Sequence, residues 1–173
     1  MSRSHTPKTP STARIEPGPG QESVWDYPRP PRVEETGEHV VVTLGGAVVA
    51  ETSHALRVLE TSHPPVYYLP RSSFAAGALH PAPGASLCEF KGQAAYADVS
   101  AGGVVAAAAA WFYRTPWAGF EVLADHVALY PGAMDSCTVD GETVTAQEGD
   151  FYGGWITSRV VGPFKGAPGT LGW

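Results

Sequence analysis

Residues 39–51 read HVVVTLGGAVVAE, two runs rich in β-branched residues on either side of Gly45-Gly46. Two such runs joined by two glycines are typical of a β-hairpin, because glycine readily takes the positive φ that a two-residue hairpin turn needs. Residues 136–144, SCTVDGETV, repeat the pattern around Asp140-Gly141. The sequence therefore predicts two antiparallel hairpins.

More short apolar stretches lie between these hairpins, and Gly or Pro bounds each of them. They are VYYLP (66–70), SLCEF (86–90), QAAYADV (93–99), WFYRTP (111–116) and HVALYP (126–131). Many short strands with close turns predict a mainly β fold with antiparallel pairing.

Two segments fit this fold less simply. Residues 72–79, SSFAAGAL, predict one short helix, because serine favours a helix start and alanine a helix interior. Residues 103–113, GVVAAAAAWFY, fit either a helix or a strand, since the alanines favour a helix and the valines and aromatic residues favour a strand.

Composition limits the function. The chain has 173 residues, 43% of them hydrophobic, which is enough for one domain with a core. A formal net charge of −6 gives no general attraction to nucleic acid, so we expect no nucleic-acid partner. The most apolar run, residues 99–113, is shorter than the roughly 20 residues that cross a bilayer, so we expect no membrane partner.

The cysteines and the first residues indicate the compartment. Cys88 and Cys137 are far apart and neither lies in a C-x-x-C pair, which excludes a four-thiolate zinc site and argues against a disulfide framework. The first residues contain no apolar run typical of a secretory signal. We expect a cytoplasmic protein with reduced thiols, no metal and no cofactor.

Composition also divides the chain. Residues 1–23 are rich in Ser, Thr, Pro and Gly and predict a disordered arm, and residues 24–145 predict the folded domain. Residues 146–173 are rich in Gly and Pro but contain five aromatic residues. Because this aromatic content is unusual for a free linker, we expect this tail to pack on the domain or on a partner.

Ordered motifs add a resemblance. The chain has E-T-x-H-P-P-V-Y-Y-x-P at 60–70, C-x-x-K-G-x-A-x-Y at 88–96 and A-W-x-Y-x-x-P at 110–116, followed by a V-A-L-Y strand and a V-D-G turn. It resembles the bacterial and fungal family catalogued as domain of unknown function 427. The resemblance implies a β-tent-like fold, in which two antiparallel sheets pack at a steep angle around a pocket. Nucleotidyl transfer needs a G-S pair followed by D-x-D, and the chain has neither.

The first motif supplies candidate pocket residues. In residues 66–70, Tyr67 lies on one strand face and Tyr68 on the other, and we assign Tyr67 to the pocket. Pro64 directs His63 away from helical backbone, and His63 serves either as a turn residue or as a base. Glu60 is a candidate partner for a cation.

The other motifs supply that cation and a ring-binding wall. Lys91 precedes Gly92, which leaves space for a ligand, and an ammonium at such a place commonly meets a carboxylate or phosphate. Trp111 and Tyr113 share one strand face and suit stacking on a planar ligand, with Tyr96 able to face them.

Cys88 stands close to Lys91 in sequence, and an ammonium can activate a thiol. In a regular strand, however, Cys88 and Phe90 point to one face and Lys91 to the other. We therefore expect Cys88 to be a small buried apolar residue rather than a nucleophile.

Three functions stay open. The first is binding of a small polar or anionic molecule, with or without a ring, in the predicted pocket. The second is an enzyme that acts on this ligand, with Lys91 and Tyr67 as acid, base or amine. The third is a protein-interaction module that uses the aromatic tail. The sequence also leaves homo-oligomerisation open.

Overall fold

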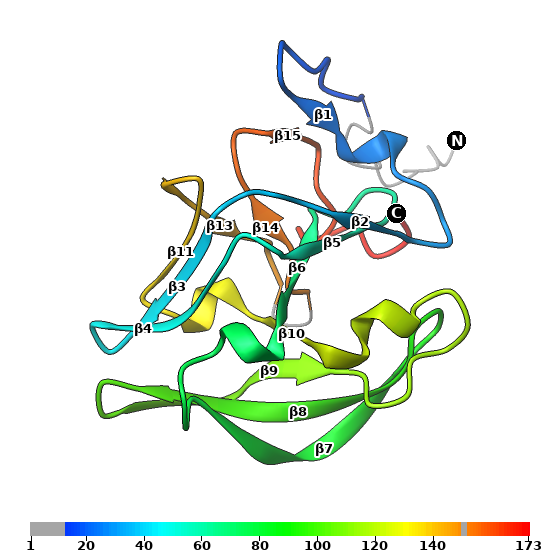
Figure 1. Cartoon of the computed structure of the whole chain (residues 1–173). Helices are drawn as coiled ribbons and strands as arrows, with labels where there is room; N and C mark the ends of the chain where they lie inside the picture. Colours follow the sequence, from blue (N-terminus) through cyan, green and yellow to red (C-terminus); the bar gives the residue numbers. More distant parts are fainter. Residues whose placement is uncertain (1–12, 150–151) are drawn as a thin grey trace, which may run out of the picture.

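The computed structural model describes residues 13–149 and 152–173, which form short strands joined by turns (Figure 1). Its helical segments are 3-10 turns, namely η1 Val24–Asp26, η2 Arg71–Ser73, η3 Glu121–Asp125 and η4 Pro131–Ala133. None of the helices within the described ranges has the length and apolarity needed to cross a bilayer. The prediction of a mainly β fold with antiparallel sheets is confirmed.

The larger sheet has seven strands in the order β2-β5-β6-β10-β9-β8-β7, and every neighbouring pair is antiparallel. The strands are β2 Arg32–Glu35, β5 Leu56–Leu59, β6 Val66–Pro70, β7 Leu79–Cys88, β8 Gly92–Ala101, β9 Val104–Phe112 and β10 His126–Leu129. Register shifts in the β7–β8 and β8–β9 pairs mark bulges, which bend strands. Figure 1 shows β7, β8 and β9 running across the view below the other strands.

The smaller sheet has four strands in the order β12-β11-β3-β4. Its strands are β3 Val40–Leu44, β4 Ala47–Thr52, β11 Ser136–Val139 and β12 Glu142–Thr143. Both predicted hairpins are confirmed, with positive φ at Gly45, Gly46, Asp140 and Gly141.

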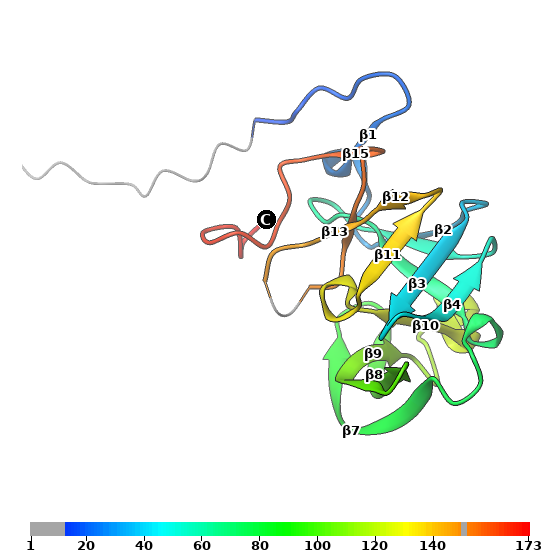
Figure 2. The same cartoon turned by 90° about the vertical axis from the view of Figure 1, so that its left-hand side faces the viewer.

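Two short strand pairs lie outside the two larger sheets and are formed by segments near the two ends of the described chain. Strand β1, Glu22–Ser23, pairs in parallel with β15, Val160–Val161, and β13, Thr145–Ala146, pairs antiparallel with β14, Trp155–Ile156. The β1–β15 pair lies at the opposite end of the molecule from β7 in both views (Figures 1 and 2). Of the predicted arm, residues 1–12 lie outside the described residues, and the last two residues form β1.

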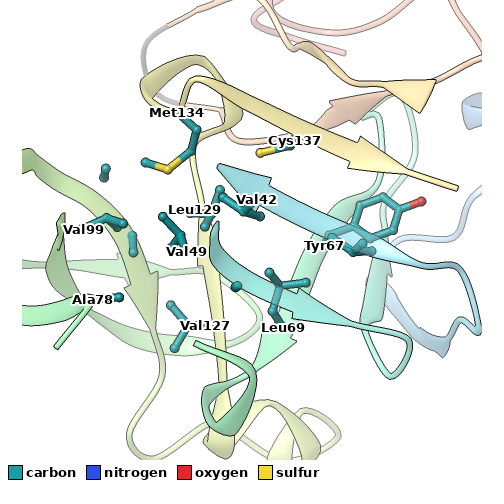
Figure 3. Close-up of a cluster of buried hydrophobic side chains, with 14 of the residues drawn as sticks. Val42, Val49, Tyr67, Leu69, Ala78, Val99, Val127, Leu129, Met134 and Cys137 are labelled. Carbon is teal, nitrogen blue, oxygen red and sulfur yellow. The ribbon is translucent and has the colours of Figure 1, made fainter. Parts of the chain in front are cut away.

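The main core lies between the two sheets. Val42 of β3 and Val49 of β4 pack in one cluster with Leu69, Val127 and Leu129 of the larger sheet (Figure 3). These side chains are fully buried, and burial of such a side chain stabilises the fold by about 1.5–3 kcal/mol. Because the smaller sheet covers this face, the opposite face of the larger sheet is the one left for a site.

The predicted helix over residues 72–79 is wrong. Residues Arg71–Ser73 form only the turn η2, Gly77 has φ +76°, and β7 begins at Leu79. The intervening backbone bonds to β4 instead, since the Ala75 N–H donates to the Val49 carbonyl at 2.8 Å. Pairing with a distant strand therefore outweighs the helix propensity of alanine.

The segment that fitted either a helix or a strand forms β9. Its backbone pairs with β8 on one side and with β10 on the other. The same competition decides the outcome here, because two strand partners satisfy backbone groups that a helix would satisfy internally.

Candidate functional site

A pocket of about 330 Å³ opens on the face of the larger sheet opposite the main core. Alternation along the strands separates the two faces: in β6, Tyr68 lines the pocket while Tyr67 and Leu69 enter the core. In β9, Trp111 lines the pocket while Ala110 and Phe112 enter the core. A volume of this size is within the range of small-molecule sites.

The turn between β7 and β8 carries the pocket's buried cation. Strand β7 ends at Cys88 and β8 begins at Gly92, so residues 89–91 form a turn instead of continuing the strand. Gly92 has φ +107°, and a Cβ there would lie 3.1 Å from the Trp117 ring. The Trp117 N–H donates to the Lys91 carbonyl at 3.0 Å and fixes the turn. Lys91 consequently lines the pocket with only 9% of its surface exposed.

Lys91 retains its charge at this buried position. Burial disfavours the ammonium, but Tyr68, Cys88 and the Glu60 carboxylate outweigh burial and raise the pKa of Lys91. The ammonium lies 6.0 Å from the centre of the Tyr113 ring. Among the carboxylates of residues 13–149 and 152–173, none lies within 4 Å of it. The pocket thus contains a buried cation with no carboxylate of the described chain in direct contact, beside the Cys88 sulfur.

Cys88 faces the same pocket, contrary to the expectation from strand alternation. The expectation fails because alternation ends at Cys88, and the turn brings Lys91 back towards the thiol. Burial would raise the pKa of Cys88, but the Lys91 charge and the backbone N–H groups of Phe90 and Lys91 outweigh it and lower the pKa. The side chain is half-buried, so the thiol is not sealed in the core.

Glu60 and His63 form a polar pair at the edge of the pocket. The Glu60 carboxylate lies 3.3 Å from the Arg29 guanidinium and 3.4 Å from His63 Nε2. Burial opposes ionisation of Glu60, yet His63, Lys91 and Arg29 together lower its pKa. The predicted direct pairing of Glu60 with Lys91 is therefore replaced by direct contact with Arg29 and His63, and Lys91 acts on Glu60 from a greater distance.

Gln147 orients the imidazole of His63. Its Oε1 accepts from the Gly154 N–H at 3.1 Å and its Nε2 donates to the Lys165 carbonyl at 2.6 Å, which assigns the two ends of the amide. The Nε2 group also lies 3.5 Å from His63 Nδ1. A neutral His63 therefore accepts at Nδ1 and keeps its proton on Nε2, facing Glu60.

Aromatic rings form the wall of the pocket. Trp111 donates from Nε1 to the Tyr68 hydroxyl at 3.3 Å, and its ring centre lies 4.6 Å from that of Tyr130. Burial is the main factor that raises the pKa values of Tyr68 and Tyr113, so both hydroxyls stay protonated at neutral pH. Tyr96 lines the pocket and donates to the Ser86 hydroxyl at 2.7 Å.

The C-terminal segment completes the pocket. A Cβ on Gly153 would lie 2.2 Å from Trp111 Cη2, so the backbone at this glycine packs directly on the indole. Lys165 also lines the pocket, and its ammonium lies 5.6 Å from the centre of the Tyr152 ring. Trp155 anchors the segment, because it is fully buried and stacks on Tyr67 at 4.8 Å between ring centres.

The structure brings together all but one of the residues predicted for the site. The predicted residues that line the pocket are Glu60, His63, Lys91, Tyr96, Trp111 and Tyr113. Tyr67 lies in the main core, where its hydroxyl donates to Glu38 at 2.8 Å. The lining residues that sequence reasoning missed include Tyr68, Cys88, Tyr130, Gln147, Tyr152 and Lys165.

Metal binding by the described residues of the site would need several ligand side chains close together. Within the part of the chain that the structure describes, three or more His, Cys, Asp or Glu side chains nowhere gather in an arrangement that could hold an ion. The functional groups that line the pocket include ammonium, thiol, carboxylate, imidazole and phenol groups.

Fold and pocket together define a mainly β protein of antiparallel sheets with an aromatic, cation-containing pocket on the outer face of its larger sheet. Residues 32–140 match the family described as Domain of unknown function (DUF427), and the chain belongs to this family. The resemblance noted in the sequence is thereby confirmed. No curated protein matches the chain. The matched range includes Glu60, Cys88 and Lys91, whereas Gln147 and Lys165 lie beyond it.

Proposed function

We propose that this protein binds a small anionic molecule with a planar or ring-shaped part. The observation that carries the proposal is the charged Lys91 ammonium, nine-tenths buried and without a carboxylate of the described chain within 4 Å. A buried charge is costly unless it is paired, and an anionic group of a ligand would supply the partner that no carboxylate of the described chain supplies.

The aromatic wall supports the planar part of the ligand. Trp111 and Tyr130 are partly exposed and present ring surfaces to the pocket, and the buried Tyr68 behind them acts on the Lys91 ammonium. Rings of this kind pack well on flat apolar groups, and a few polar groups fix the ligand's orientation. One charged contact beside a ring-sized wall fits an aromatic carboxylate or phosphate.

The test uses benzoate and phenyl phosphate as probes, with benzamide as the neutral analogue, in isothermal titration calorimetry. We expect Lys91→Met to weaken binding of the anions by about 1.5–3 kcal/mol, the value of a charge-assisted hydrogen bond, and to leave benzamide unaffected. The melting temperature should hold or rise, because the substitution removes an ammonium from a partly dry pocket.

Arg71→Met is the matched control for the loss of one positive charge. The Arg71 guanidinium lies 4.6 Å from the centre of the Phe112 ring, outside this pocket, so the variant should bind the anions as the unmodified protein does. Equal binding of benzoate by the Lys91→Met protein would refute the proposal. Native mass spectrometry of the protein purified from its own host would identify a retained ligand directly.

A further inference from the structure

The thiol of Cys88, at the end of β7, and the ammonium of Lys91, in the turn that follows, face the same pocket. We infer that Cys88 is a nucleophilic cysteine that forms a covalent bond with an electrophilic carbon of a small anionic molecule held beside Lys91. The anionic part of this inference rests on the proposed function, whereas the reactivity of the thiol stands on the geometry of the turn.

Access and position favour a reactive thiol. Cys88 is half-buried in the pocket wall, where small reagents can reach it, and it ends β7 rather than lying inside a paired strand. Lys91 follows in the turn and is itself nine-tenths buried. A cation close to a sulfur stabilises the thiolate, which is the form of cysteine that attacks carbon.

Among the charged and titratable groups around Cys88, Lys91 has the largest effect on the thiol. The Lys91 charge lowers the pKa of Cys88 against the effect of burial. Tyr68 from β6 and Tyr113 after β9 line the same pocket as Cys88, and burial keeps both of these hydroxyls neutral. Glu89 is exposed beside it in the turn, while Glu60 acts on Lys91 and helps to keep the ammonium protonated.

Cys137 provides an internal comparison. It lies in β11, buried in the main core, where burial alone raises the pKa of its thiol to about 12. One chain therefore contains two free cysteines with opposite surroundings, one beside a cation in a pocket and one in an apolar core. Reactivity should be confined to the first.

The bond-forming step needs no group from outside the pocket. The thiolate donates an electron pair to the electrophilic carbon, an S–C bond forms, and the leaving group departs with the electrons of its own bond to that carbon. Sulfur becomes neutral in the product. The Lys91 ammonium, which faced a thiolate before the reaction, is then left to pair with the anionic group of the bound molecule.

Iodoacetamide and iodoacetate form a matched pair of probes, because they share the reacting carbon and the iodide leaving group and differ in charge. The native protein is treated with each at a series of pH values, and peptide mass spectrometry follows Cys88 and Cys137 separately. We expect Cys88 to be alkylated with a pH midpoint below the roughly 8.5 of free cysteine and Cys137 to remain unmodified. Glutathione in the same buffers gives the reference rates.

Variants of Lys91 test whether its charge is what activates Cys88. Lys91→Met should raise the pH midpoint of Cys88 and slow alkylation by iodoacetamide at pH 7, by about threefold for each tenfold loss of thiolate, because a more basic thiolate is also more nucleophilic. Lys91→Arg keeps the charge and should restore the low midpoint. If Lys91→Met fails to fold, the midpoint of the unmodified protein against glutathione still decides the question.

The two reagents distinguish the two ideas. A Cys88 midpoint at or above that of glutathione overturns the nucleophilic cysteine. The second outcome compares the rates of the two reagents. If the midpoint is low but the ratio of the iodoacetate rate to the iodoacetamide rate is no higher for Cys88 than for glutathione, anion binding beside Lys91 is overturned and the reactive thiol stays in place. Both ideas are supported if the ratio exceeds that of glutathione and falls in the Lys91→Met protein.

Discussion

Tyr67 and Tyr68 are neighbours in β6, yet their side chains serve different parts of the molecule. Tyr67 stacks on Trp155 in the main core, and its hydroxyl donates to Glu38 at 2.8 Å. Tyr68 is fully buried at the back of the pocket, and its hydroxyl accepts from the Trp111 indole. At the scale of single residues, this pair therefore separates stability from ligand binding.

Substituting each tyrosine by phenylalanine tests the assignment. Tyr67→Phe should lower the free energy of unfolding by about 1.5–3 kcal/mol, the value of a hydrogen bond to a charged group, and leave benzoate affinity unchanged. Tyr68→Phe removes the acceptor for the Trp111 N–H at the pocket and should weaken benzoate binding by about fivefold. Urea unfolding and calorimetry measure the two effects. Reversed results would move the site to the other face of the sheet.

The sequence could separate these two side chains but could not orient them. Alternation places Tyr67 and Tyr68 on opposite faces of any strand, whereas the buried face is decided by the smaller sheet, whose strands come from both sides of β6 in the sequence. The Cys88–Lys91 contact was considered and wrongly rejected for a related reason, because period-two alternation has no meaning once the chain enters a turn.

At the scale of elements, the two sheets touch at the tips of two hairpins. The β3–β4 turn holds Gly45, and the β8–β9 turn holds Gly102 and Gly103, each with positive φ. A Cβ on Gly102 would lie 1.9 Å from the Gly45 carbonyl oxygen, but a Cβ on Gly103 would meet nothing within 4 Å. The adjacent glycines thus separate the cost of backbone conformation from that of close approach.

Alanine substitutions at these adjacent positions test the contact between the tips. Gly103→Ala should cost about 1–2 kcal/mol, the penalty for an L-residue at positive φ. Gly102→Ala should cost about 1–3 kcal/mol more, because the added methyl group forces two backbone segments apart. Chemical denaturation of both variants measures the difference. Equal destabilisation would show that the tips can separate at no cost.

Local pattern predicted the elements best where the chain alternates between clear strands and glycine turns. Residues 66–70 were predicted as a strand and form β6, and the Gly45-Gly46 and Asp140-Gly141 turns lie where expected. Residues 72–79 and 103–113 were harder, since their alanine-rich composition favours a helix while distant strands supply their backbone partners. Those partners come from far along the chain, which local propensity does not contain.

The pocket depends on the whole molecule, because its wall joins the family-matched domain to the C-terminal segment. The segment brings Gln147, Tyr152, Gly153 and Lys165 to the pocket, and these residues follow no motif that sequence reasoning recognised. Their positions depend on the burial of Trp155. Within the matched range, the ordered motifs were sufficient to predict Glu60, His63, Lys91, Tyr96, Trp111 and Tyr113 as neighbours.

An ion-pair network joins both ends of the described chain to the larger sheet. Arg57 of β5 is fully buried and bonds to Glu22 of β1 and to Glu34 of β2. Arg159, just before β15, lies 3.6 Å from Glu22 and 3.0 Å from Glu38. Because the carboxylates surround an arginine that has no exposure to water, the loss of one partner leaves a buried charge less well compensated.

Glu22→Gln tests this network through its dependence on pH. Burial would raise the pKa of Glu22, but Arg57 and the neighbouring groups outweigh it and lower the pKa below its ordinary value of 4.5. The stabilisation by the carboxylate is therefore complete above that value and is lost as pH falls through the lowered pKa. At pH 7 we expect the variant to be less stable by about 1–2 kcal/mol, with the difference between the two proteins shrinking on acidification.

Urea unfolding at several pH values between neutral and strongly acidic measures this difference. Glu35→Gln is the matched control, because Glu35 is an exposed carboxylate at the end of β2, and its substitution should change stability little at any pH. The β1–β15 pair should also loosen in the Glu22→Gln protein, since Glu22 belongs to β1 and contacts the arginine just before β15. Hydrogen exchange in the wild-type protein tests the same cause. At acidic pH, exchange at Glu22 and Val160 should be faster than the pH dependence of intrinsic exchange predicts. A constant stability difference from neutral to acidic pH would instead show that packing of the side chain, and not its charge, holds the two ends of the described chain to the sheet.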